Sequence, residues 1–185
     1  MALSSEHGFP TWLGVGTVLL GWSSAALGDA RQGLDLIRKG TSISSATGTV
    51  LVAARDLTSQ AECYAVLGRA ADGLGCLDEA EQIVDRTWQR VWEVDVLRVR
   101  GDLLNATGDR AAAEESYHRA LAVARRQSAK TPELHAATSL ARLWRDQGKR
   151  AEARDLLAPV YGWFTEGHDT PVLKEAKTLL EQLTS

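Results

Sequence analysis

Histidines and paired acidic residues are the side chains of this sequence that could support acid–base or metal chemistry. The acidic pairs Glu79/Glu81 and Glu114/Glu115 fall on segments where solvent-exposed helix faces are expected. No G-x-S-x-G turn for a nucleophilic serine occurs. No two histidines have the i, i+4 spacing that places two metal ligands on one helix face; they are His7, His118, His135 and His168. We therefore expect no catalytic residue, no metal site, no cofactor and no enzymatic activity.

Two further features resemble functional sites only in composition. Cys63 and Cys76 form no C-x-x-C pair and have no histidine at zinc-binding spacing, so they are expected to be free thiols in a reducing compartment. The segment GWFTEGHD, residues 162–169, combines aromatic, acidic and histidine side chains. We expect it to pack Trp163 and Phe164 beneath a final helix rather than to form a site.

A long uncharged run near the start, Trp12 to Gly28, has the composition of a membrane anchor and contains a glycine pair that resembles a phosphate loop. It holds several glycines and serines and lacks flanking basic residues, which disfavours a membrane span. No strand precedes it and no Gly-Lys-Ser/Thr follows, which disfavours a phosphate loop. The run is instead expected to be the first helix, over residues 9–27, with Leu20 and Gly21 at positions of helix contact.

Composition indicates a soluble all-α protein. The 185 residues include 44% hydrophobic and 24% charged residues and only four prolines. The formal net charge of −3 predicts no binding to nucleic acid and none to an anionic membrane. No lysine or arginine precedes the apolar run, as a secretory signal would require, so a cytoplasmic location is expected.

An internal repeat positions these elements. Gly28, Gly75, Gly108 and Gly148 each precede an alanine-rich helical stretch, and their spacing is close to regular. Small residues allow two antiparallel helices to approach closely. We therefore expect small residues on each first helix to face small residues on each second helix, as Gly68 facing Ala80 and Gly101 facing Ala113.

The spacing around these glycines resembles the tetratricopeptide repeat, whose units are helix–turn–helix hairpins of about 34 residues. The resemblance implies an all-α fold, an α-α superhelix of antiparallel helix hairpins closed by a C-terminal capping helix. We expect a single domain over residues 1–185. Its expected parts are four units and a capping helix: 9–48, 51–93, 94–131, 132–166 and 170–184.

Residues 6–22, 118–148 and 137–183 also resemble the C-terminal repeat region of large bacterial signalling proteins. In that family a class III adenylate/guanylate cyclase domain and an ATPase domain precede a tetratricopeptide tail. The catalytic and nucleotide-binding motifs of those upstream domains match nothing here, so the resemblance implies only a scaffold role.

A concave surface is the functional surface expected in such an array, because the first helices line it. The positions that point into it are polar and charged, and the Lys and Asn clamp of chaperone-binding relatives is not reproduced. A protein or peptide partner is therefore expected. The expected contact residues are Glu62, Arg69, Asp72, Asp95, Arg98, Asp102, Asn105, His135, Arg142 and Arg145.

The first helix is expected to be apolar on nearly all faces, which would leave an exposed patch larger than monomers usually tolerate. We therefore expect self-association to a homo-oligomer through Trp12, Leu13, Leu19, Leu20 and Trp22. Taken together, the sequence predicts a non-catalytic protein-interaction or regulatory scaffold. The alternatives are a purely structural or oligomerisation segment and, third, an enzyme.

Overall fold

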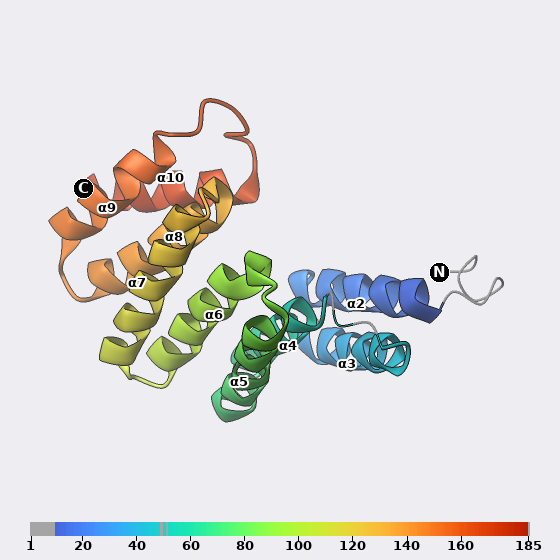
Figure 1. Cartoon of the computed structure of the whole chain (residues 1–185). Helices are drawn as coiled ribbons and strands as arrows, with labels where there is room; N and C mark the ends of the chain where they lie inside the picture. Colours follow the sequence, from blue (N-terminus) through green and yellow to red (C-terminus); the bar gives the residue numbers. More distant parts are fainter. Residues whose placement is uncertain (1–9, 49, 51, 185) are drawn as a thin grey trace. The chain divides into compact units, whose positions relative to one another are not determined.

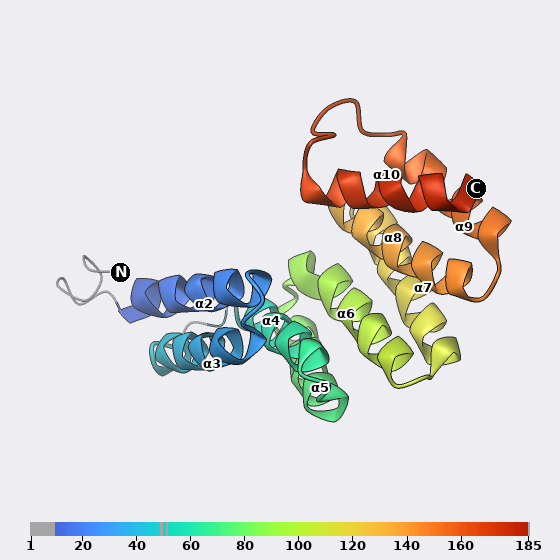
Figure 2. The same cartoon turned by 180° about the vertical axis from the view of Figure 1, so that it is seen from behind.

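The structure, a computed structural model, describes residues 10–48, 50 and 52–184. Within them it contains α-helices, one 3-10 turn (Arg90–Trp92) and no strand, so the all-α prediction is confirmed (Figures 1 and 2). His7, and residues 9 and 51, where two units were expected to begin, lie outside the described residues. The α-helices are α2 (Pro10–Ala26), α3 (Ala30–Ala46), α4 (Ala53–Val66), α5 (Ala70–Thr87), α6 (Glu93–Ala106), α7 (Arg110–Arg126), α8 (Lys130–Asp146), α9 (Arg150–Tyr161) and α10 (Pro171–Thr184).

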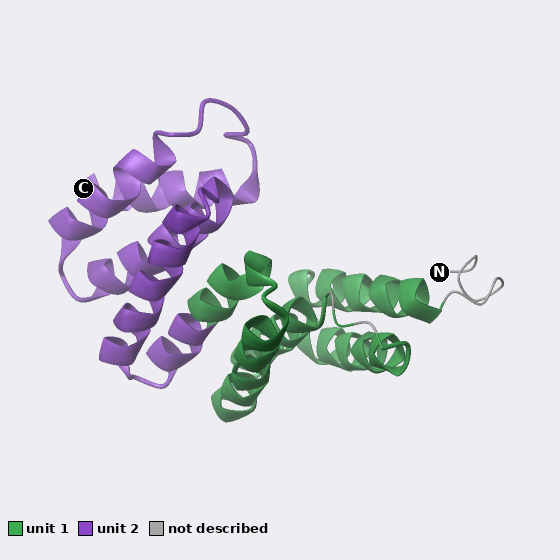
Figure 3. Cartoon of the chain, in the orientation of Figure 1, with its two compact units in different colours: residues 1–99 green, residues 100–185 purple. Residues whose placement is uncertain are grey.

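The chain divides into two compact units, residues 1–99 and 100–185 (Figure 3). In the first unit, α2 packs against α3, α4 packs against α5, and α4 also contacts α3. In the second unit, α8 packs against α7 and α9, and α10 packs against α8 and α9. The boundaries expected for a single domain of four units remain a prediction.

Left-handed residues mark the helix ends at equal steps along the chain. Positive φ angles occur at Gly28, Gly48, Gly68, Trp88, Gly108, Ser128 and Gly148. Every second one joins the two helices of a hairpin, so two steps make one repeat and the repeat length is constant. The expected turn at Gly75 is therefore wrong, because Gly75 lies inside α5. Gly68, expected on the face of a first helix, is the turn itself, with φ +70°.

Two of the turns carry a second local signal, the dipeptide Gly-Asp. Asp29 follows Gly28, and its carboxylate accepts a hydrogen bond of 2.9 Å from the backbone N–H of Gln32. Asp109 follows Gly108 and accepts one of 3.1 Å from Ala112. The glycine allows the left-handed turn and the aspartate caps the next helix, so α3 and α7 begin where the sequence dictates.

The closest helix contact is that of α2 with α3, which lie side by side in both views (Figures 1 and 2). A Cβ atom added to Gly21 would lie 2.6 Å from the carbonyl oxygen of Gly33, and one added to Gly40 would lie 2.6 Å from that of Gly14. Gly21 is thus confirmed as a contact position. Leu20 is not, because its side chain is 48% exposed.

Gly101 makes the corresponding contact in the second unit, but with a different partner from the expected Ala113. An added Cβ would lie 2.4 Å from the ring of Tyr117. Tyr117 is buried, and its hydroxyl donates a hydrogen bond of 2.7 Å to Asp102. A large side chain against glycine, rather than small against small, joins α6 to α7.

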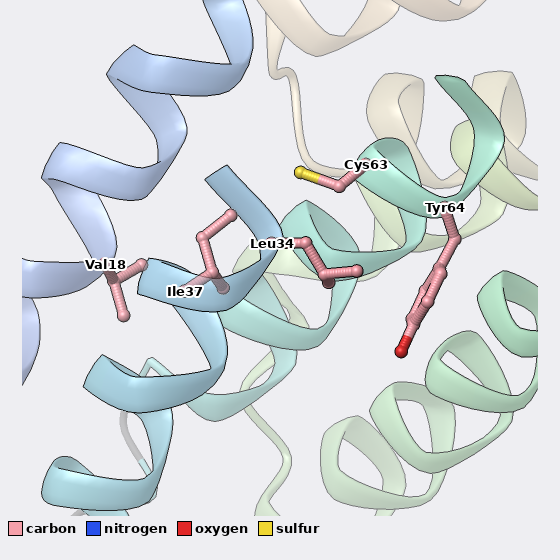
Figure 4. Close-up of a cluster of buried hydrophobic side chains, with 5 residues drawn as sticks. All are labelled: Val18, Leu34, Ile37, Cys63 and Tyr64. Carbon is pink, nitrogen blue, oxygen red and sulfur yellow. The ribbon is translucent and has the colours of Figure 1, made fainter. Parts of the chain in front are cut away.

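The core of the first unit continues from α2 and α3 into α4. Val18, Leu34, Ile37, Cys63 and Tyr64 form one buried cluster (Figure 4). Burial raises the pKa of the Cys63 thiol to about 11, so this cysteine packs as an apolar side chain.

The segment 162–169 does not pack as expected. The Trp163 side chain is 57% exposed and contacts the edge of Phe164, with ring centroids 5.1 Å apart. The ammonium group of Lys130 lies 5.8 Å from the Trp163 ring. Of the two aromatic side chains, only Phe164 is half-buried. Elsewhere, no helix among the described residues is both long enough and apolar enough to cross a bilayer.

Candidate functional site

The observed repeat length changes which of the expected contact residues lie on first helices. Arg69 directly precedes α5 and Asp72 lies in its first turn, so both belong to a second helix and their assignment to the concave surface is wrong. They pair with each other, with Arg69 Nε 2.9 Å from Asp72 Oδ2. The Arg69 guanidinium also lies over the ring of Tyr64, 4.8 Å from its centroid. The pair thus braces the turn after α4.

In the first unit, three of the expected residues are brought together. Arg98 on α6 donates a hydrogen bond of 2.8 Å to Glu62 on α4, and its Nε lies 3.8 Å from Asp95. Glu62 also lines a small groove of about 180 Å³ between α2 and α4. The other lining residues are mostly apolar: Trp22, Ala25, Ala26, Ser59, Cys63 and Val66.

The expected contact residues of the second unit divide by environment. The carboxylate of Asp102 accepts the hydrogen bond from buried Tyr117 and so helps to hold α6 against α7. Asn105 and His135 are half-buried. Arg142 and Arg145, in contrast, line a groove between α8 and α10, with a volume of about 330 Å³.

The groove between α8 and α10 is the most site-like feature of the second unit. Arg142 forms an ion pair with Glu175 on α10. The Arg145 Nη1 donates a hydrogen bond of 2.7 Å to the side chain of Gln182, and its Nε donates one of 2.9 Å to Asp146. The remaining lining residues are Thr178 and Leu179. Two guanidinium groups thus face a polar wall contributed by α10.

Glu175, Thr178 and Gln182 were not among the residues expected from sequence, because α10 was interpreted only as a capping helix. The signal that identifies them is the repeat itself. Glu175 and Gln182 lie one repeat after His135 and Arg142, so α10 repeats the contact positions of a first helix. With the correct repeat length, the sequence predicts α10 as one wall of the groove.

Arginine pairs in such a groove can bind carboxylates. A guanidinium presents five N–H donors in a fixed plane and binds a carboxylate through two parallel hydrogen bonds. The Arg142 and Glu175 side chains are partly exposed, so an incoming carboxylate can compete with Glu175 for Arg142. The chemistry that the groove offers is therefore recognition of acidic groups.

Two deeply buried carboxylates lie outside both grooves. Glu133 in the first turn of α8 is 4% exposed and is bound by Arg125 and Lys130, at 2.9 and 2.8 Å. Although burial opposes the charged form, the hydrogen bonds from Lys130 and Arg125 leave the pKa of Glu133 lowered. Burial raises the pKa of Asp56, against the pairing with Arg55. Both contribute to folding rather than to a site.

The residues expected to mediate self-association are exposed in all but one case. Trp12, Leu19, Leu20 and Trp22 are exposed, whereas Leu13 is half-buried. No charged residue lies between Pro10 and Ala26. The open faces of α2 are therefore apolar.

Comparison with known proteins agrees with this architecture. Among curated proteins, no sequence matches the chain. Residues 134–161, which lie within α8 and α9, match the family model described as tetratricopeptide repeat. Two crystal structures of nearly identical TPR-like repeats, from a protein described as a kinesin light chain of Podosopora anserina, are similar over 95% of this chain and 94% of theirs. Each is 18% identical with a TM-score of 0.66, so the chain has the fold of tetratricopeptide-like repeats.

Proposed function

We propose that the chain is a non-catalytic protein-interaction module that binds an acidic peptide segment in the groove between α8 and α10. Folds of this kind generally mediate protein–protein interaction or scaffolding. The observation that carries the proposal is the arginine pair Arg142 and Arg145 lining that groove. Among the described residues, both are held in place by polar side chains of α10 or by Asp146.

Removal of both arginines should abolish most of the binding of acidic peptides. The test uses a set of fluorescently labelled peptides that differ in their number of glutamates, measured at low and high salt. Wild-type affinity is expected to rise with the number of glutamates. Arg142→Ala with Arg145→Ala should weaken binding about tenfold or more, because each charge-assisted contact contributes about 1 kcal/mol or more. High salt should weaken the wild-type interaction.

The matched control is Lys174→Ala with Lys177→Ala. It removes two positive charges from α10 in the same unit, at exposed positions that do not line the groove. Affinity is expected to stay within about twofold of wild type, since exposed charges contribute little. If the lysine variant loses as much binding as the arginine variant, general charge attraction explains the binding and the groove assignment is wrong.

We also propose that the chain self-associates through α2. The exposed tryptophans and leucines of this helix support the proposal, because contiguous apolar surface of this kind is commonly covered by a partner. Light scattering of the purified chain at tens of micromolar should show a dimer or larger species. A monomer under those conditions would contradict it.

A bacterial signalling role in the cytoplasm, beside cyclase and ATPase domains, is proposed only from the sequence resemblance. Its test is whether the neighbouring in-frame coding sequence contains those domains. A purely structural segment is the second candidate, and it would be unaffected in function by the arginine variant. An enzyme would show saturable turnover that a single substitution abolishes.

A further inference from the structure

One edge of α2 carries residues in the register that other helices of this chain use for packing between hairpins. We call Gly16, Leu20, Ser23 and Leu27 the upstream edge; they are spaced four, three and four residues apart along α2 and the residue after it. Leu20 is 48% and Leu27 is 89% exposed. Ser23 is also exposed, so this edge is open to solvent.

The same register is buried on α4. One repeat after Leu20 and Ser23 lie Gln60 and Cys63, both buried. The side-chain amide of Gln60 donates a hydrogen bond of 3.4 Å to Thr41 on α3. Cys63 belongs to the cluster with Leu34 and Ile37 (Figure 4). This edge of α4 is therefore the surface that packs onto the α2/α3 hairpin.

Later helices repeat the pattern. On α8 the corresponding residues Ala136, Leu140 and Leu143 are buried, and on α10 Ala176 and Leu183 are buried. Each of these helices packs against helices that precede it in its own unit. The upstream edge of α2 is thus a hairpin-packing surface by register, and it is exposed.

We propose that the upstream edge packs antiparallel against the same edge of a second copy, about a two-fold axis between Leu20 and Ser23. The inference rests on the self-association proposed above and specifies its surface. In this pairing Leu20 contacts Ser23 of the partner subunit, and Leu27 contacts Gly16 of the partner subunit. Each large side chain meets a small residue, the arrangement that already joins Gly21 to Ile37 and Gly40 to Val18. A two-fold interface requires such self-complementarity.

Charge favours a second α2 over the other end of the chain as the occupant. The upstream edge has no charged residue and none lies elsewhere on α2. The exposed surface of α10 carries Lys174, Lys177 and Glu181. Packing α10 of another copy onto this edge would desolvate those charges without partners, which is costly. Pairing of two α2 helices buries only apolar and small residues.

The test is an exchange of the two central residues. Leu20→Ser and Ser23→Leu should each weaken dimerisation about tenfold or more, measured as the dissociation constant by sedimentation or light scattering over a concentration series. The first removes buried apolar surface, and the second places leucine against leucine. The double variant restores one leucine opposite one serine, and its dissociation constant should return to within about threefold of wild type.

Leu19→Ser is the matched control, because Leu19 is 50% exposed, adjacent to Leu20, and outside the upstream edge. It should leave dimerisation nearly unchanged, and circular dichroism should show native helical content in all variants. A dimer that survives Leu20→Ser but is lost in Leu19→Ser would keep self-association and overturn this edge. Failure of the double variant to recover would overturn the antiparallel pairing. A monomeric wild-type chain would overturn both proposals.

Discussion

Replacement of Gly21 by alanine should lower the free energy of unfolding by about 3 kcal/mol. The new Cβ would lie 2.6 Å from the carbonyl oxygen of Gly33 and 2.8 Å from the backbone nitrogen of Ile37. Both are backbone atoms, so no side-chain rotation relieves the overlap and the two helices must separate. Separation would loosen the packing of Val18 and Ile37, which are fully buried. Urea unfolding followed by circular dichroism measures the loss.

Gly75→Ala is the matched control, since it makes the same chemical change inside another helix of the same unit. No atom lies within 4 Å of a Cβ added to Gly75. Alanine favours helix over glycine by about 1 kcal/mol, so this variant should be slightly more stable than wild type. Equal effects of the two substitutions would show that α2 and α3 do not approach as closely as described.

Replacement of Glu133 by glutamine should destabilise the second unit by about 2 kcal/mol at neutral pH. Glutamine keeps the shape of the side chain but removes the charge that binds both Arg125 and Lys130. The pKa of Glu133 is lowered in the folded chain, so its charged form stabilises folding above its unfolded pKa near 4.5. That stabilisation is lost as the pH falls through the lower folded value. The difference between wild type and variant should therefore be largest at neutral pH and shrink below about pH 4.

Glu115→Gln is the control for this change, because Glu115 is exposed on α7 in the same unit. It removes the same charge and should alter the free energy of unfolding by less than about 0.5 kcal/mol. Urea titrations at several pH values compare the two variants. A Glu133 effect that persists unchanged in acid would show that shape rather than charge determines its role.

The sequence by itself determined the helical hairpins of this chain. Helix-favouring composition, scarce proline and Gly-Asp turns act locally, so the ends of α2, α3 and α7 follow from neighbouring residues. The close contact at Gly21 was also predictable, because only a small residue allows two helices to meet there. The arginines Arg142 and Arg145 were identified from their spacing along one helix face.

Tertiary structure decided the repeat length, because two glycines in the second hairpin, Gly68 and Gly75, fit the sequence spacing equally well. Only the packing of α4 on α5 selects Gly68 as the turn. The regular steps were hidden in sequence, since Trp88 and Ser128 occupy two of the left-handed positions that glycine usually fills.

Tertiary structure also decided what each charged residue contacts. Asp102 binds Tyr117, Arg69 binds Asp72, and Arg142 binds Glu175, each through a residue that spacing on one helix does not reveal. A charged side chain takes the nearest partner that neighbouring helices provide. The pattern along one helix predicts which side chains face outward, whereas their pairing depends on which helix lies beside them.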